Sequence, residues 1–217
     1  MNIIELFPVP LGVSNIGRPL TKEELDFIDR LKDESRPNGS NVMSKNQAVL
    51  HEEPLTQLKS ELESSINEYF HTVWCPTEDS DLEIYITASW FTWTYKEESH
   101  HVHAHPNSFI SGTFYVSADD SDAIDFPNDR LYYSNLQVET HPEKLNIFNC
   151  QNYRELTKPG DIKLFPSTLK HYVSDKQSDY PRICLAFNTW IKGTIGHPDL
   201  STELKVPGMP YEMELML

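Results

Sequence analysis

The chain has 217 residues, enough for a single domain with a sizeable core. Its 18 Lys and Arg against 33 Asp and Glu give a net charge of −15, which argues against nucleic-acid binding through a basic face. Three cysteines without CxxC spacing argue against a disulfide scaffold, and no apolar run approaches the roughly 20 residues of a membrane span. We therefore expect a cytoplasmic protein without a nucleic-acid or membrane partner; a homodimer is left open.

Two helices are predicted in the first 80 residues. Thr21 and Glu24 form a capping-box pattern ahead of an apolar repeat at Leu25, Ile28 and Leu31, and residues 36–39 (RPNG) end this helix. A second helix is predicted over residues 53–73, with the apolar stripe Leu55, Leu58, Leu62, Ile66, Tyr69 and Val73. Both stripes are typical of helices that cover a sheet.

From residue 82 onward the apolar period changes to two, which predicts strands. Strict alternation would put Ile84, Ile86, Ala88 and Trp90 on one face of the first strand, and Tyr85, Thr87, Ser89, Phe91 and Trp93 on the other. Further strands are predicted over residues 109–117, 131–138, 146–154, 161–165 and 183–191, with the acidic stretch 117–129 as a solvated loop. Short strands after two helices favour a mostly β fold, an antiparallel sandwich or jelly roll with helices packed outside.

Four of the nine histidines lie within six positions: His100, His101, His103 and His105. Residues i and i+2 of a strand share a face about 6.5–7 Å apart, so an adjacent pair can bind one metal ion, whereas three in a row would span about 13 Å. A third ligand must then come from a distant strand, and His171 is the natural candidate. Spacing alone leaves a zinc or nickel site, or an incidental surface cluster, open.

Arg182 follows His171 by eleven residues, in an otherwise apolar predicted strand. A guanidinium keeps its charge when buried and binds carboxylates bidentately, so a bound dicarboxylate would give it a partner. An ordinary ion pair with one of the 33 acids is the alternative.

Together these motifs resemble the 2-oxoglutarate/Fe(II)-dependent oxygenases. Residues 103–116 look like the first metal strand of that superfamily and the strand after it, residues 158–171 like the distal-histidine segment, and residues 182–188 like the co-substrate strand. Residues 5–11 are similar to the opening of a branch with an HxHP metal strand, found in marine bacteria and phages. The resemblance covers nearly the whole chain and implies a double-stranded β-helix, the cupin-like jelly roll, in a bacterial or phage-infected cell.

Carried over by position, His103 and His171 match the two metal-binding histidines of the family, and Arg182 and Tyr115 match the residues that bind the far carboxylate of 2-oxoglutarate. His105 departs from the pattern, since most relatives have Asp or Glu there. Three options follow: His105 binds the iron, a neighbour such as His101 or Asn107 takes part, or only two protein ligands exist.

The resemblance implies the cofactor Fe(II), the co-substrates 2-oxoglutarate and O2, an unidentified small-molecule or protein substrate, and hydroxylation with release of succinate and CO2. It implies one domain over residues 1–217, with a helical part (1–80), a jelly-roll core (81–195) and a tail (196–217). Trp90, Phe91 and Trp93 can wall the cavity, or equally be core residues. Two alternatives remain: a three-histidine cupin-like metalloenzyme without 2-oxoglutarate, and a non-catalytic jelly-roll binding or structural protein.

Overall fold

The computed structural model describes residues 1–129 and 138–208. Its α-helices are α1 (Lys22–Asp33) and α2 (Thr56–Trp74), with 3-10 turns at Val49–His51, Glu53–Leu55, Pro142–Lys144 and Pro198–Leu200. Its strands are β1 (Gly12–Asn15), β2 (Ser35–Asn38), β3 (Asn41–Ser44), β4 (Glu83–Thr94), β5 (His100–His103), β6 (Ile110–Ser117), β7 (Ala123–Pro127), β8 (Asn152–Leu156), β9 (Asp161–Pro166), β10 (His171–Val173), β11 (Arg182–Ile195) and β12 (Leu204–Val206). No helix in these described ranges is long and apolar enough to cross a membrane.

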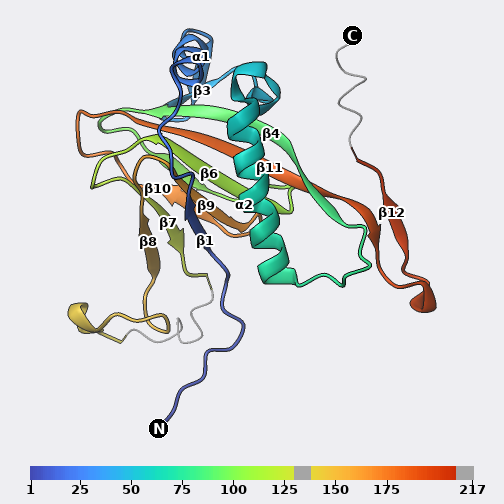
Figure 1. The fold of residues 1–217 in the computed structure, drawn as a ribbon. Coiled ribbons are helices and arrows are strands. Elements are labelled where there is room, and N and C mark those ends of the chain that lie inside the picture. The colour runs from blue at the N-terminus through green and yellow to red at the C-terminus, as the bar shows by residue number, and fades with distance from the viewer. Residues whose placement is uncertain (130–137, 209–217) are drawn as a thin grey trace.

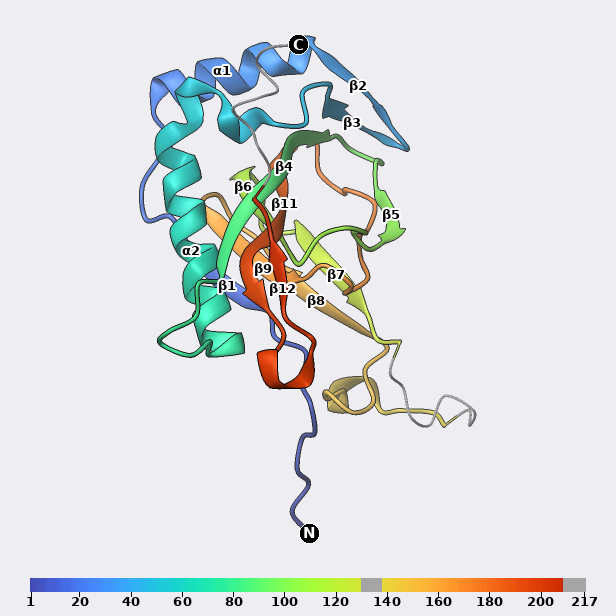
Figure 2. The ribbon, with the colours of Figure 1, turned by 90° about the vertical axis from the view of Figure 1, so that its right-hand side faces the viewer.

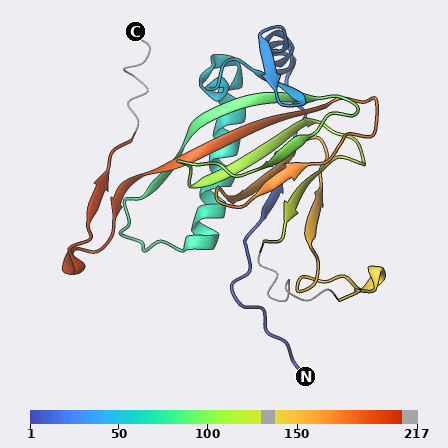
Figure 3. The same cartoon turned by 180° about the vertical axis from the view of Figure 1, so that it is seen from behind.

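The strands form two antiparallel sheets (Figure 1). The larger sheet has the order β1-β9-β6-β11-β4-β3-β2, with β12 paired to β11, and the smaller has the order β5-β10-β7-β8. The longest strands, β4 and β11, run alongside each other through the larger sheet (Figure 3). The predicted mostly β jelly roll with flanking helices is confirmed.

The helices lie on the face of the larger sheet that points away from β5 and β7 (Figure 2). Leu58, Leu62 and Ile66 of α2 are fully or almost fully buried, and they belong to one apolar cluster with Phe91 and Trp93 of β4. Burial of apolar surface at this interface stabilises the fold and fixes α2 across the sheet. The prediction that the helical stripes cover a sheet is confirmed, although Val73, at the end of the stripe, is exposed.

The start of α1 follows the sequence prediction. The Glu24 amide donates to the Thr21 hydroxyl at 3.2 Å, and the Thr21 amide donates to the Glu24 carboxylate at 2.6 Å, which completes the capping box. Leu25 is exposed, however, while Ile28 and Leu31 are buried. The residues predicted to end the helix belong to β2 and its hairpin turn to β3.

A bulge in β4 changes which of its residues face the helices. Along the ladder with β11, Asn188 lies opposite Ala88 but Thr189 lies opposite Ile86, so Thr87 is an extra residue in the register. An extra residue shifts the alternation, and every side chain after it changes face relative to strict period two.

The side chains of β4 follow this shift. Ile84 and Ile86, before the bulge, and Phe91 and Trp93, after it, all belong to the core beneath the helices, whereas Trp90 faces the space between the two sheets. The prediction that Trp90 shares a face with Ile84 and Ile86 is therefore wrong, because the bulge depends on pairing with β11.

The acidic stretch 117–129 is not a solvated loop. It contains β7, and Asp122 and Asp125 are 5% and 1% exposed. Asp125 accepts hydrogen bonds from Arg154 at 3.1 and 3.2 Å, and also from Asn152 and Ser174, each at 3.0 Å. Partners from distant segments offset the cost of burying these carboxylates, and a local count of charges does not detect them.

The remaining predicted strands have mixed outcomes. Residues 109–117, 161–165 and 183–191 correspond to β6, β9 and β11, whereas the strand predicted over 146–154 begins only at Asn152. The strand predicted over 131–138 lies almost entirely outside the described residues.

Candidate metal centre

Three of the predicted histidines meet between the two sheets. His103, the last residue of β5, lies directly opposite His171, the first residue of β10. His105 follows the end of β5, where its amide donates to the Ser167 carbonyl at 2.9 Å. The ring nitrogens that His103, His105 and His171 offer all lie within 4.8 Å of one another, a spacing that suits one shared metal ion.

Backbone hydrogen bonds fix two of these rings. Nδ1 of His103 lies 2.9 Å from the His101 carbonyl, and Nδ1 of His171 lies 3.0 Å from the Leu169 carbonyl. A carbonyl can only accept, so each Nδ1 carries the proton and each Nε2 has a free lone pair. This is the arrangement in which a second interaction orients a metal-binding histidine.

The environment also keeps the three rings neutral. Burial, reinforced by the neighbouring histidines, lowers the pKa of His105 to about 3. Burial lowers the pKa of His171 to about 4, although its hydrogen bond to Leu169 acts in the opposite direction, and burial likewise lowers the pKa of His103. At neutral pH protons therefore do not compete with a metal ion for these nitrogens.

The histidines open onto a cavity of about 60 Å³ between the sheets. The larger sheet contributes side chains from β4, β6 and β11, and the smaller sheet contributes side chains from β5, β7 and β10: Trp90, Thr92, Thr113, Tyr115, Arg182, Cys184, Ala186, His100, His103, Ile124, His171 and Val173, joined by Asn41 and His105. A space of this size suits a small anion better than a nucleotide or an aromatic cofactor. A larger depression of about 730 Å³, between α1 and the start of α2, contains none of the histidines.

Arg182 lies in the wall of this cavity and is 2% exposed. One terminal nitrogen donates to the Ala123 carbonyl at 3.3 Å, the other donates to the Thr94 hydroxyl at 3.2 Å, and Nε has no partner among the described residues. A guanidinium has five N–H donors, so three remain for a ligand. Tyr115 lines the same cavity, and burial raises the pKa of its hydroxyl, which therefore remains protonated and able to donate.

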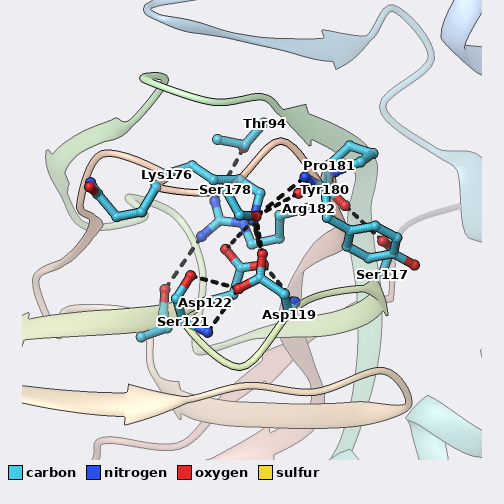
Figure 4. Close-up of polar contacts among 12 residues, drawn as sticks. Thr94, Ser117, Asp119, Ser121, Asp122, Lys176, Ser178, Tyr180, Pro181 and Arg182 are labelled. Carbon is cyan, nitrogen blue, oxygen red and sulfur yellow. Dashed lines mark hydrogen bonds and ion pairs between the residues drawn. The ribbon is translucent and has the colours of Figure 1, made fainter.

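A buried ion-pair cluster lies next to Arg182 (Figure 4). Lys176 Nζ lies 2.7 Å from an Asp119 oxygen and 2.9 and 3.0 Å from the two oxygens of Asp122. The Lys176 amide also donates to the Glu98 carbonyl at 2.9 Å. The cluster thus connects the loop before β7, the loop after β4 and the loop that leads into Arg182.

His100 is a cavity residue that sequence reasoning missed. Along the β5–β10 ladder, Val173 lies opposite His100 while His171 lies opposite His103, so three residues of β10 match four of β5. The irregularity brings His100 and His103 to the cavity, although strict alternation would put them on opposite faces. The cluster of four histidines was visible in the sequence, but its spacing did not show which of the four side chains face the cavity.

The other candidates named from the sequence lie elsewhere. The His101 side chain is exposed, and Asn107, whose φ is +53°, is not among the residues that line the cavity. Trp90 does wall the cavity, with its ring centroid 6.0 Å from that of His105. Phe91 and Trp93 are core residues beneath the helices.

Part of the chain matches a known protein family. Residues 88–188 match the family described as "Putative 2OG-Fe(II) oxygenase", a match that begins in β4 and ends in β11 and includes all the predicted site residues. Among curated proteins, no sequence matches the chain.

Solved structures share the fold at low sequence identity. The α-ketoglutarate-dependent epimerase SnoN of nogalamycin biosynthesis aligns with a TM-score of 0.55 at 10% identity, over 93% of this chain and 88% of its own. HygX from Streptomyces hygroscopicus, solved with nickel, 2-oxoglutarate and hygromycin B, aligns with a TM-score of 0.52 at 10% identity, over 83% and 82%. A prolyl-4-hydroxylase from Pseudomonas putida aligns with a TM-score of 0.52 at 10% identity, over 83% and 92%. The family match thus extends from β4 to β11, and the solved structures show that this chain shares their fold.

Proposed function

We propose that this protein is an Fe(II)- and 2-oxoglutarate-dependent dioxygenase. His103, His105 and His171 hold the iron, and Arg182 and Tyr115 bind the far carboxylate of 2-oxoglutarate. One observation carries the proposal: three neutral histidines converge in a cavity whose wall also contains a buried arginine with an unpartnered Nε. The residues fit both groups, since imidazole is a good iron ligand and guanidinium binds carboxylate bidentately.

Bound together, iron and 2-oxoglutarate supply an oxidation that consumes O2 and releases succinate and CO2. The protein contributes position and environment. Arg182 is held by Thr94 and Ala123, so its remaining donors have a fixed direction. Trp90 and Ile124 wall the cavity and limit access of water to the reacting groups. The neutral Nε2 atoms of His103 and His171 are oriented before the metal binds.

The all-histidine donor set favours one alternative, a three-histidine metalloenzyme that does not use 2-oxoglutarate. Imidazole donors also suit zinc, nickel and copper. That alternative leaves the buried charge of Arg182 without a ligand partner, so we prefer the oxygenase.

Finer aspects belong to the same proposal. We infer hydroxylation as the reaction, membership of the HxHP branch, one domain over residues 1–217 and a cytoplasmic location. The titles of the structural neighbours include both a hydroxylase and an epimerase, so the product must be determined directly. The substrate is a small molecule or a protein side chain.

The test is turnover and binding of 2-oxoglutarate. Purified protein with Fe(II) and O2 should form succinate from 2-oxoglutarate, and anaerobic titration of the Fe(II) form should give a metal-to-ligand absorption band. Arg182→Ala should weaken 2-oxoglutarate binding by about 2–5 kcal/mol, or roughly 30-fold to several thousand-fold, while iron still binds. Arg182→Lys should recover only part of the lost affinity for 2-oxoglutarate, because the point charge of an ammonium group does not reproduce the planar, bidentate guanidinium.

Arg36→Ala removes an exposed arginine outside the cavity and is the matched control. Absence of 2-oxoglutarate binding in the wild type would refute the oxygenase proposal. Equal affinity for 2-oxoglutarate in the wild type and in Arg182→Ala would refute only the proposed role of Arg182 in binding the far carboxylate.

A further inference from the structure

We propose that His100 is a ligand-binding residue of this cavity, and that its Nδ1–H donates to a carboxylate oxygen of the anion held between the three histidines and Arg182. The identity of that anion as 2-oxoglutarate rests on the proposed function. The role of His100 rests on its own position and contacts.

The topology puts His100 between the two ends of the cavity. β5 begins at His100, six residues after Thr94, whose hydroxyl binds Arg182, and it ends at His103 beside His171. On the paired strand, β10 begins at His171, and Val173, opposite His100, leads into the loop that ends at Arg182. An extended anion that reached from the metal end to the arginine would therefore pass His100.

The ring of His100 packs edge-on against His103, with 4.6 Å between centroids and 89° between planes. This contact orients the ring and leaves its Nδ1 enclosed and without a hydrogen-bond partner among the described residues. Buried polar atoms nearly always have a partner, so an enclosed nitrogen on a cavity wall indicates that a ligand supplies one.

The unpartnered atoms converge on this cavity. Of the six buried side-chain nitrogens and oxygens that lack a partner in the described part of the chain, three belong to its lining: His100 Nδ1, Thr113 Oγ1 and Arg182 Nε. The Arg182 guanidinium is a cation, and the His100 and Thr113 side chains can each donate a hydrogen bond. This combination matches the oxygens of a carboxylate. Arg182 supplies the charge, and His100 adds a directed hydrogen bond from the opposite sheet.

A second reading is that His100 is a metal ligand. Ring nitrogens of His100, His101 and His103 also lie within 4.8 Å of one another. We disfavour this, because His103 already uses Nδ1 on a backbone carbonyl and has only Nε2 to offer, and because His101 is exposed.

The experiment compares three variants: His100→Phe keeps a flat ring and removes the donor, His100→Asn retains an N–H close to the position of Nδ1, and His101→Phe changes the exposed neighbour. Each is loaded with Fe(II) under anaerobic conditions, assayed for metal content and titrated with 2-oxoglutarate; circular dichroism and thermal melting confirm folding. We expect one metal per chain in all variants. His100→Phe should bind 2-oxoglutarate at least tenfold more weakly, His100→Asn within a few-fold of wild type, and His101→Phe like the wild type.

Each other outcome has a defined meaning. Wild-type affinity in His100→Phe overturns the proposal, and so does loss of metal from that variant, which would make His100 a ligand. If the wild type binds metal but not 2-oxoglutarate, the proposed function fails, and the same variants are titrated with malonate and succinate. Weaker binding of either dicarboxylate by His100→Phe then still supports a carboxylate-binding role. Absence of any dicarboxylate binding by the wild type overturns that role as well.

Discussion

Replacing Lys176 with methionine tests the buried cluster beside the arginine end of the cavity. The Lys176 side chain is 1% exposed, and Asp122 and Asp119 are 5% and 23% exposed. Methionine retains most of the side-chain volume, so the change mainly removes the charge. Breaking a buried pair leaves an uncompensated carboxylate and costs about 3–5 kcal/mol. For a domain of this size the melting temperature should fall by roughly 6–20 °C.

Lys96 provides the matched control. It pairs with Asp179 at 3.1 Å, but the two side chains are 48% and 88% exposed, so Lys96→Met should cost about 0–1 kcal/mol. Urea unfolding of the metal-free proteins, followed by tryptophan fluorescence, measures both changes. Adding Asp122→Asn to Lys176→Met should restore part of the loss, because it removes a buried charge. Similar destabilisation by Lys176→Met and Lys96→Met would refute the reasoning.

The cluster should also depend on pH. Burial opposes ionisation of Asp119, but hydrogen bonds from Lys176, Ser121 and Ser178 outweigh it and hold the pKa of this carboxyl well below its usual range. A depressed carboxyl pKa contributes stability above the unfolded value of about 4, and this contribution is lost as pH falls through the folded pKa. The difference between wild type and Lys176→Met should therefore narrow in strong acid. A difference that stays constant would contradict the ionic origin.

Three further outcomes are expected. His171→Ala should lose stoichiometric metal by elemental analysis, whereas His71→Ala, at an exposed position on α2, should retain it; full metal content in His171→Ala would rule out this ligand assignment. The metal-free protein should lose thermal stability as pH falls from about 6.5 towards 4. In that range the histidines of the unfolded chain bind protons, whereas the buried His105 and His171 of the folded protein stay neutral. Fe(II) should increase the thermal stability most above that range, and a melting temperature that does not change with pH would contradict this. Gly112→Ala should destabilise the protein by about 1–3 kcal/mol in urea unfolding, because the new Cβ would lie 2.4 Å from the Phe187 ring, and an unchanged midpoint would show that the ring can move.

The elements set by local pattern could be predicted from the sequence. A capping box needs only Thr21 and Glu24 three residues apart, and the stripe of α2 needs only its own 3.6-residue period. The residue types of the site could also be predicted from the sequence, because few other patterns combine clustered histidines, a distant His171 and a lone Arg182 in an apolar strand.

Only the tertiary structure decided which side chains face the cavity. The irregularities at Thr87 in β4 and within β5 arise from pairing with β11 and β10, and each reverses the alternation that the strand would have alone. Trp90 and His100 face the cavity for this reason. Burial of Asp122 likewise depends on Lys176, which lies 54 residues away in the chain. Period and composition describe a strand's own residues, whereas register and ion pairing are set by the partner that the fold brings alongside.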